Sequence, residues 1–240
     1  MRYQRQEMLP DFNGVTALLH HKKVGIVGVG GLGGLCSYLL VGAGVLNLNI
    51  ADGDTVSLSN LHRQILYREA DIGKEKALCC KRELEALDSR VKVQTFSFIN
   101  EDNFVAFAQN CDLILDLSDN VTTRLFISDA CCRNRIDYIH AAVGGYQGIL
   151  SAFWYSDPSF LKECGCYRCF SGLNADLKTQ GILGPAAAMM SSAAAMLTLQ
   201  VLKGNDSLKG YIQFFDLKNN AVRKMKLSKD SSCPVCREHK

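Results

Sequence analysis

The sequence predicts an α/β fold with a Rossmann-like, doubly wound and mostly parallel sheet, extended by antiparallel strands in its C-terminal part and carrying a Cys₄ zinc-knuckle site. Three observations predict it. Short apolar runs alternate with segments of helical spacing from residue 22 to about residue 142, a glycine-rich turn follows the first run, and two C-x-x-C pairs lie far apart in the second half. Strands joined by crossover helices form parallel sheets with helices on both faces.

The 240 residues can bury one full core, and no Pro/Gly/Ser linker or internal repeat divides them. We therefore expect a single domain over residues 1–240, made of an N-terminal helical arm (1–21), a nucleotide-binding half (22–145), and a half with the crossover, the zinc site and the C-terminus (146–240). The net charge is only +3 and no block of lysine and arginine occurs, so no nucleic-acid partner is expected.

The N-terminus, MRYQRQEML, is charged from its second residue and has no apolar core, so it does not resemble a signal peptide. The apolar run 186–202 is short for a membrane span and contains serine, threonine and glutamine, so we expect a buried helix and no membrane association. Eleven cysteines without a secretory signal indicate mostly reduced thiols in a cytoplasmic protein.

The first predicted strand, 24–28, ends in the glycine turn. Gly28, Gly30 and Gly33 fit G-x-G-x-x-G, a turn that usually holds the phosphates of a dinucleotide at the start of a helix. This motif indicates only that the backbone approaches a phosphate group closely, so it fits NAD and ATP equally well.

The second predicted strand, 46–52, ends in ADGD, which places Asp52 and Asp54 at the same edge of the sheet. An acidic residue about 20 positions after the glycines normally holds a ribose hydroxyl. Asp52 therefore predicts a nucleotide without choosing between the two candidates.

The segment VSLSNLHRQILYREADIGKEKA, residues 56–77, is unusually rich in groups that bind phosphate: Asn60, Arg63, Gln64 and Lys76. A dinucleotide has little need of them, because backbone N–H groups already serve its pyrophosphate. A triphosphate under attack builds negative charge on the leaving pyrophosphate, and fixed cations lower that barrier. Taken singly, each residue could be an ordinary surface side chain.

Two more strands are predicted at 91–96 and 112–117, and a fifth at 137–142. The fourth ends in DLSDN, which places Asp116, Asp119 and Asn120 at the same edge. A carboxylate beside a polyphosphate requires a cation between them, so Asp119 is a candidate Mg²⁺ ligand. The GxxxxGK[ST] pattern is absent from the sequence, which excludes a P-loop NTPase.

Beyond residue 147 the pattern changes. We predict an antiparallel strand at 148–156, a long alanine-rich helix that begins near Pro185, and a closing hairpin made by residues 211–216 and 221–227.

The pairs Cys166/Cys169 and Cys233/Cys236 have the spacing of two zinc knuckles and predict a closed, structural Cys₄ site. A redox C-x-x-C pair is the rival interpretation. Cys164 is close enough in sequence to replace Cys166 as a ligand.

Taken together, the segments RYQRQ (2–6), GVGGLGG, ADGDTVSLSNLHRQ, IGKEK, LDLSDN, CYRC and CPVC closely resemble, in this order and spacing, the ThiF/MoeB/HesA family. These proteins are bacterial relatives of the ubiquitin-activating E1 enzymes. The resemblance runs from residue 2 to residue 236. It implies an adenylyltransferase that uses MgATP to activate the C-terminal carboxylate of a small ubiquitin-like sulfur-carrier protein ending in Gly-Gly, releasing pyrophosphate.

The resemblance also implies the site residues and a homodimer in which Arg5 reaches into the neighbouring subunit's site. No general base is expected, because the attacking carboxylate is already ionised at neutral pH. The catalytic residues would be Arg5, Arg63, Lys76 and Asp119. The nucleotide would be bound by Gly28, Gly30, Gly31, Gly33, Asp52, Asp54, Ser59, Asn60, Leu61, His62, Arg63, Gln64, Lys76, Asp119 and Asn120, and the zinc by Cys166, Cys169, Cys233 and Cys236.

One departure from the family pattern concerns the crossover segment, where Leu177 stands at the place of a cysteine that many members use for a covalent intermediate. We therefore expect adenylation without a covalent enzyme intermediate. Cys164 is the nearest alternative thiol. Because no sulfurtransferase segment follows Cys236 in the sequence, an external sulfur donor is expected.

Three alternatives remain open at this stage, as does the choice between thiamine and molybdopterin pathways. The chain could activate a short peptide in natural-product maturation, which the missing loop cysteine favours. It could be an NAD-dependent oxidoreductase, for which His140, placed at a strand end, is the only plausible partner in hydride transfer. A non-catalytic scaffold is disfavoured because Arg63, Lys76 and Asp119 are all present.

Overall fold

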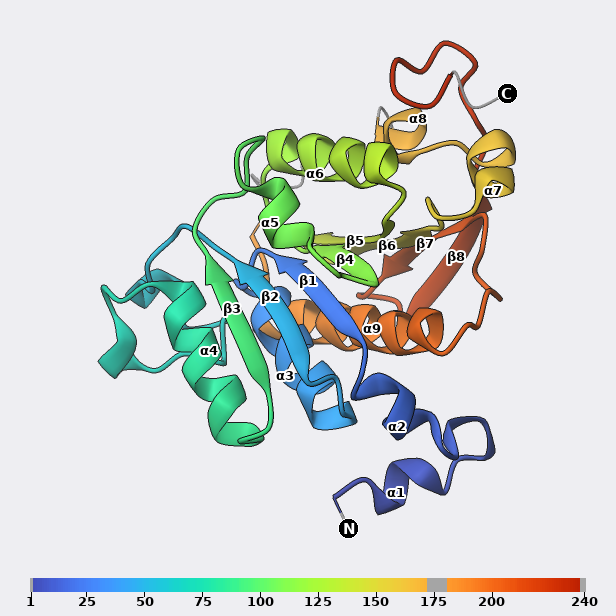
Figure 1. Cartoon of the computed structure of the whole chain (residues 1–240). Helices are drawn as coiled ribbons and strands as arrows, with labels where there is room; N and C mark the ends of the chain where they lie inside the picture. The colour runs from blue at the N-terminus through green and yellow to red at the C-terminus, as the bar shows by residue number, and fades with distance from the viewer. Residues whose placement is uncertain (1, 172–180, 238–240) are drawn as a thin grey trace.

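A computed structural model describes residues 2–171 and 181–237 of the chain. An eight-stranded sheet with the order β3-β2-β1-β4-β5-β6-β7-β8 runs through the molecule (Figure 1). The pairs from β3 to β5 are parallel, and β6, β7 and β8 continue the same sheet in antiparallel pairing. The strands are β1 (Lys23–Val27), β2 (Asn47–Ala51), β3 (Lys92–Phe96), β4 (Leu113–Asp116), β5 (Asp137–Gly144), β6 (Gln147–Phe153), β7 (Tyr211–Asp216) and β8 (Ala221–Lys226).

The predicted fold class is therefore confirmed, and each predicted strand is found with its ends shifted by at most three residues. The hairpin predicted in the C-terminal part is β7 and β8, which pair from Tyr211↔Lys226 to Asp216↔Ala221. Together with β6 this hairpin forms the antiparallel extension that the sequence predicted, and it joins the sheet through β6.

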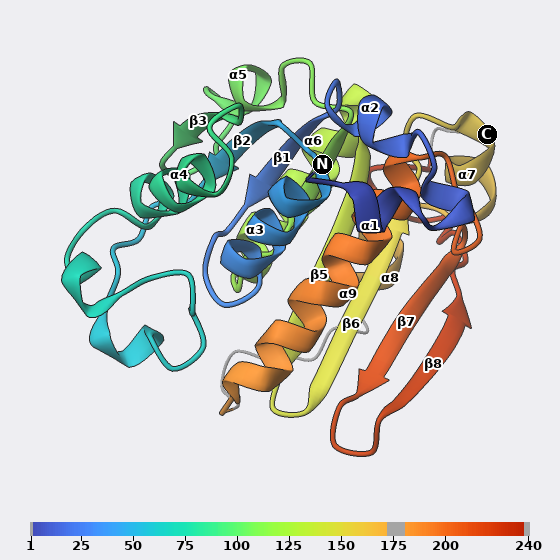
Figure 2. The same cartoon turned by 90° about the horizontal axis from the view of Figure 1, so that it is seen from below.

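Helices cover both faces of the sheet (Figures 1 and 2). One face carries α3, α4 and α9, and the other carries α5, α6 and α8. The α-helices are α1 (Gln4–Glu7), α2 (Val15–Leu19), α3 (Gly33–Ala43), α4 (Lys76–Leu87), α5 (Phe104–Ala108), α6 (Val121–Asn134), α7 (Pro158–Glu163), α8 (Tyr167–Ser171) and α9 (Gly184–Leu202), with 3₁₀ turns at Pro10–Phe12, Leu58–Asn60 and Glu69–Asp71.

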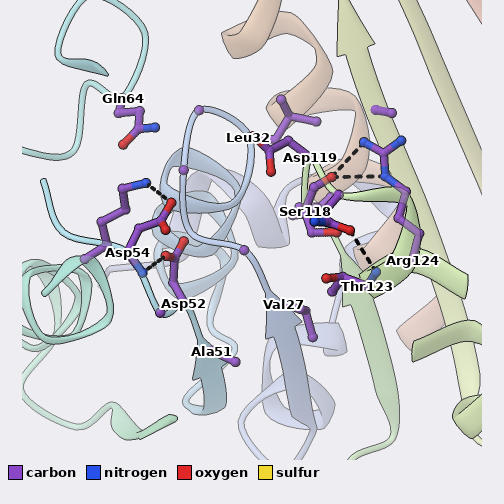
Figure 3. Close-up of a pocket in the computed structure, with 18 of the residues that line it drawn as sticks. Val27, Leu32, Ala51, Asp52, Asp54, Gln64, Ser118, Asp119, Thr123 and Arg124 are labelled. Atoms are coloured by element: carbon purple, nitrogen blue, oxygen red, sulfur yellow. Dashed lines mark hydrogen bonds and ion pairs between the residues drawn. The ribbon is translucent and has the colours of Figure 1, made fainter. Parts of the chain in front are cut away.

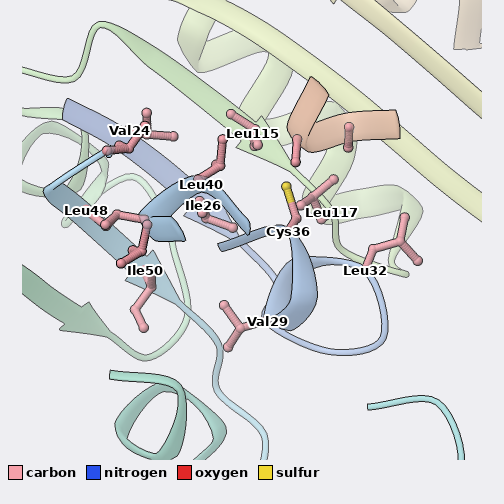
Figure 4. Packing of buried hydrophobic residues seen from close by; sticks show 14 of the residues in the cluster. Val24, Ile26, Val29, Leu32, Cys36, Leu40, Leu48, Ile50, Leu115 and Leu117 are labelled. Carbon is pink, nitrogen blue, oxygen red and sulfur yellow. The ribbon is translucent and has the colours of Figure 1, made fainter. Parts of the chain in front are cut away.

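Two hydrophobic cores result, because successive residues of a strand point to opposite faces. In β4, Leu113 and Leu115 pack with α3 and α9, whereas Ile114 between them packs with α5 and α6. Figure 4 shows the first core, where Cys36 and Leu40 of α3 lie over the central strands. Burial raises the pKa of the Cys36 thiol to about 12, so this cysteine acts as a small apolar core residue.

Among the described residues, α9 is the helix whose length and apolar composition would allow it to cross a membrane. More than half of the residues in its most apolar stretch are buried. Ala187, Met190 and Ala194 are fully buried against α3 and the sheet, as expected for a core helix. This packing agrees with the buried helix predicted from the sequence.

The N-terminal arm lies at the amino ends of the strands, far from the glycine turn along β1 (Figure 1). Gln6 fixes α1 there, since its amide nitrogen donates to Thr16 Oγ1 (3.1 Å) and to the carbonyl of Ala43 (2.9 Å). Tyr3 adds a hydrogen bond to the carboxylate of Asp88.

Candidate active site

A pocket of about 510 Å³ opens at the carboxyl ends of the central parallel strands (Figure 3). Residues from the ends of five strands line it: Val27, Ala51, the segment 97–99, the segment 117–120, and the segment 141–143. Ligands of open α/β sheets bind at this edge, where the order of the strands reverses. The strand order reverses here between β1 and β4.

The glycine turn forms one wall of the pocket, and two of its glycines are required by geometry. Gly28 has a positive φ of 84°, and a Cβ there would lie 2.9 Å from the backbone of Ser118. A Cβ on Gly33 would lie 1.8 Å from the carbonyl oxygen of Gly28. The backbone can therefore turn sharply and α3 can start directly against the strand only because no side chains are present.

Asp52 braces the turn from the end of β2. One carboxylate oxygen accepts from Val29 N (2.9 Å) and the other accepts from Asp54 N (2.9 Å). Burial raises the pKa of the Asp52 carboxyl above its ordinary value, while these hydrogen bonds oppose the shift. Asp52 therefore stabilises the glycine turn through Val29, in addition to its expected contact with a ribose.

Lys76, the first residue of α4, is 5% exposed, and its Nζ lies 2.9 Å from Asp54 Oδ2. The side chain of Asp54 is 67% exposed, so this ion pair lies at the surface of the pocket. The buried side chain of Lys76 extends to Asp54 from the start of α4. Asp54 lies beside Asp52 in Figure 3. An anion that enters the pocket would compete with Asp54 for the ammonium group.

Arg63 and Gln64 also lie next to the glycine turn. Arg63 lines the pocket and donates from Nη1 to Ser59 O (3.2 Å), with His62 Nε2 at 2.9 Å from the same nitrogen. Gln64 is buried and lies close to the glycine turn, because a Cβ added to Gly30 would be 3.2 Å from its Nε2. Its Oε1 has no hydrogen-bond partner among the described residues.

The end of β4 supplies the third set of polar groups. Asp119 is exposed, lines the pocket, and makes no hydrogen bond or ion pair with the part of the chain described. Its free carboxylate fits an Mg²⁺ ligand, since this ion prefers oxygen ligands and binds through one or two carboxylates plus phosphate. Asn120 also lines the pocket, but its side-chain oxygen caps α6 by accepting from Thr123 N.

Several predicted residues lie elsewhere. Ser59, Asn60, Leu61 and His62 are not among the described residues that line the pocket, and neither is the buried Gly33. Asn60 acts through its backbone, because its carbonyl accepts from the amides of Arg63 and Gln64. The segment 59–62 therefore shapes the loop that presents Arg63.

Two other residues named from the sequence are buried. Asp116 is the last residue of β4, as predicted, but its side chain is fully buried, accepts from Ser118 and from the hydroxyl of Tyr138 (2.9 Å), and has the pKa of its carboxyl raised by burial. His140 is not at a strand end: it lies inside β5, is fully buried, and burial holds its pKa well below the usual value. A hydride-transfer role for His140 has no support in this geometry.

Arg5 is exposed on α1 and does not line the pocket of its own chain. Leu177 lies outside the described residues. Arg124 was missed by the sequence reasoning, although it lines the pocket, is 8% exposed, and donates from Nε and Nη2 to the carbonyl of Ser118. Arg124 lies one turn into α6, outside every sequence motif that was used to predict the site.

The four cysteines of the two knuckles come together as predicted. The Sγ atoms of Cys166, Cys169, Cys233 and Cys236 all lie within 4.8 Å of one another, which fits the ligand spacing of tetrahedral Zn–S coordination. Cys164 is not part of this cluster in the described chain. Such a site would join α8 to the C-terminal segment, 67 residues further along the chain.

The fold and the pocket define a nucleotide-binding α/β protein of the E1-like class, with a Cys₄ cluster on the face of the sheet that carries α6 and α8. The chain belongs to the ThiF family, whose model matches residues 3–235.

Among curated relatives, the chain is 33% identical over 246 residues to the sulfur carrier protein ThiS adenylyltransferase of Escherichia coli (strain K12), covering 98% of this chain and 94% of the relative. It is 34% identical over 244 residues to the molybdopterin-synthase adenylyltransferase of the same organism, covering 98% and 96%. A sulfur carrier protein adenylyltransferase of Thermus thermophilus is 32% identical over 245 residues, covering 98% and 90%.

Among solved structures, E. coli MccB with ATP superposes with a TM-score of 0.82 at 20% identity, covering 99% of this chain and 75% of that chain. PaaA superposes with a TM-score of 0.79 at 24% identity, covering 95% and 73%. These two similarities support the fold.

Proposed function

We propose that this chain adenylates the C-terminal glycine carboxylate of a small ubiquitin-like sulfur-carrier protein, using ATP and releasing pyrophosphate, for sulfur transfer in thiamine or molybdopterin synthesis. The main support is the gathering of Arg63, Lys76 and Asp119 around one glycine turn in a member of the ThiF family. The names of the curated relatives, all of them adenylyltransferases, point the same way.

In the proposed reaction, a carboxylate oxygen of the carrier attacks the α-phosphorus of ATP. The new bond is the P–O bond of an acyl adenylate, the bond between the α-phosphorus and the bridging oxygen breaks, and pyrophosphate leaves with the electron pair. No proton moves in this step. Catalysis then depends on positioning the two reactants and on neutralising the charge of the leaving group.

The residues divide these tasks by position. The backbone of Gly30 and Gly31 would approach the phosphates, while Arg63 and Lys76 would neutralise the pyrophosphate. Asp119 would hold Mg²⁺, which when bound neutralises phosphate charge. Arg5 would act in the partner subunit of a homodimer, since the arm of its own chain lies at the other end of the strands.

The proposal also includes a single-domain, cytoplasmic enzyme with zinc in the Cys₄ cluster, where the metal would tie α8 to the C-terminal segment. With leucine at position 177, the acyl adenylate would pass directly to an external sulfur donor and not to an enzyme thiol.

ATP–pyrophosphate exchange with candidate carriers tests the proposal. Exchange is expected with an intact carrier and not with the same carrier lacking its terminal Gly-Gly. Exchange driven by a short peptide, but by none of the carriers, would favour the second candidate, activation of a peptide in natural-product maturation, which the leucine at position 177 supports.

A further inference from the structure

Phe98 is a large aromatic residue that stands open at the pocket. Two residues beyond β3, its side chain is 68% exposed, and Ser97, Phe98 and Ile99 all line the pocket. An aromatic ring with this exposure has lost little water on folding and is available to a ligand.

The ring of Phe98 lies directly over Gly53. A Cβ on Gly53 would come within 2.3 to 2.5 Å of the ring atoms Cζ, Cε2 and Cε1. Real Cβ atoms do not approach other atoms so closely, so any side chain at position 53 would displace the ring. Gly53 has no positive φ, so the effect of its missing side chain that the structure shows is the space occupied by the ring of Phe98.

The turn that carries Phe98 is held in place independently of the ring. Asn103 Nδ2 donates to the carbonyl of Phe98 (2.7 Å), and Asn103 Oδ1 accepts from Asn100 N (2.9 Å). The backbone of Asp52 donates to the carbonyl of Phe96 (3.2 Å), which ties this turn to the ribose side of the pocket.

The pocket lining includes a small apolar group next to Asp52. Val27, Ala51 and Ile99 pack in one hydrophobic cluster and line the pocket together with Phe98, at or just beyond the ends of β1, β2 and β3. Asp52 directly follows Ala51 in the chain. A nucleotide with its phosphates at the glycine turn and its ribose at Asp52 would place its base next to this apolar group.

We infer that Phe98, seated on Gly53, is the surface on which the base of the bound nucleotide stacks. This inference rests on the proposed function, which supplies ATP as the ligand. Stacking depends on the π-face that every base has, so Phe98 should contribute affinity for ATP and GTP alike and should not select adenine. It should also affect nucleotide binding more than the chemical step, because the base is remote from the α-phosphorus.

A double-mutant cycle on the purified full chain tests the inference, with the Kd of a non-hydrolysable ATP analogue measured by calorimetry. Phe98→Ala should weaken binding about tenfold, which corresponds to about 1.4 kcal/mol. Phe98→Tyr should keep most of the affinity. Gly53→Ala should weaken binding by displacing the ring, and the double variant should be no weaker than Phe98→Ala alone.

Val105→Ala is the matched control, because Val105 is an apolar side chain, 72% exposed on the nearby α5, that does not line the pocket. It should leave the Kd unchanged. In exchange assays, Phe98→Ala should raise the KM for ATP about tenfold and leave kcat and the KM for the carrier within about twofold of wild type.

An unchanged Kd in Phe98→Ala would overturn the inference, and so would additive losses for Phe98→Ala and Gly53→Ala. A change in the KM for the carrier alone would also reject it and assign Phe98 to the protein substrate. Failure of the proposed function is distinguishable, since it would appear as wild-type protein that binds the ATP analogue but catalyses no exchange with any carrier.

Discussion

Replacing Lys76 tests whether its charge is needed for catalysis and not for the stability of the fold. The ammonium group lies 2.9 Å from Asp54, and the lysine side chain is 6% exposed while the side chain of Asp54 is 67% exposed. Because Asp54 stays hydrated when Lys76 is removed, the variant leaves no buried charge without a partner.

The two expected magnitudes differ widely. An ion pair with so exposed a partner contributes at most about 1 kcal/mol to stability. A fixed cation that faces the charge developing in a transition state contributes about 3 kcal/mol, or a factor of about 100 to 1,000 in kcat. Lys76→Met, which keeps the buried stem, should therefore reduce exchange at least about 100-fold with a small change in Tm.

The assay is ATP–pyrophosphate exchange at saturating carrier, beside thermal unfolding and zinc content of the same preparations. Lys74→Ala is the matched control: Lys74 lies two residues earlier, is 57% exposed, and its Nζ is 3.6 Å from Asp71. It should retain exchange. If Lys76→Met exchanged within tenfold of wild type, the role of Lys76 in neutralising pyrophosphate would be refuted.

The remaining predictions concern other parts of the chain. Asp119→Asn should abolish exchange with Tm unchanged, and partial recovery at high Mg²⁺ would be consistent with a weakened metal site. Arg5→Ala and Lys76→Ala subunits, each inactive alone, should recover part of the activity when mixed, and no recovery would remove the in-trans role. Cys233→Ser should lose zinc, measured by elemental analysis, and lower the Tm, whereas an unchanged metal content would reject the Cys₄ site. Asp157, which precedes α7, forms an ion pair with Lys209, and the hydrogen bond from this lysine lowers the pKa of the Asp157 carboxyl to about 2. Since this pKa is below the unfolded value of about 4, Asp157→Asn should cost about 1 kcal/mol at pH 7, and chemical unfolding should show the difference from wild type closing as pH falls from about 4 to about 2.

The sequence predicted the strands well because their signals are local. The β4 run alternates residues that fill two different cores, and each parallel strand ends in a turn with its own polar residues. The antiparallel extension was also predicted, but the neighbour that each of its strands pairs with was not, since pairing between distant strands depends on packing that no local pattern records.

The candidate site was predicted in part. Gly28, Asp52 and Lys76 were found because a turn, a strand end and a helix start each restrict the residue type. His140 was misplaced, and the burial of the Asp116 side chain was missed, because burial of a polar group inside a sheet cannot be read from its spacing. The contact between the ring of Phe98 and Gly53 was missed for a related reason, since the two residues come together only when β2 and β3 pair.

The fate of oxygen in the carboxylate tests the central claim most directly. A carrier whose terminal carboxylate is labelled with ¹⁸O would be incubated with the enzyme and ATP, and the adenylate would be released with hydroxylamine, which attacks the carbonyl carbon. The account predicts AMP containing one ¹⁸O atom and unlabelled pyrophosphate. Label in inorganic phosphate together with ADP, or AMP without label, would contradict attack of the tail carboxylate on the α-phosphorus.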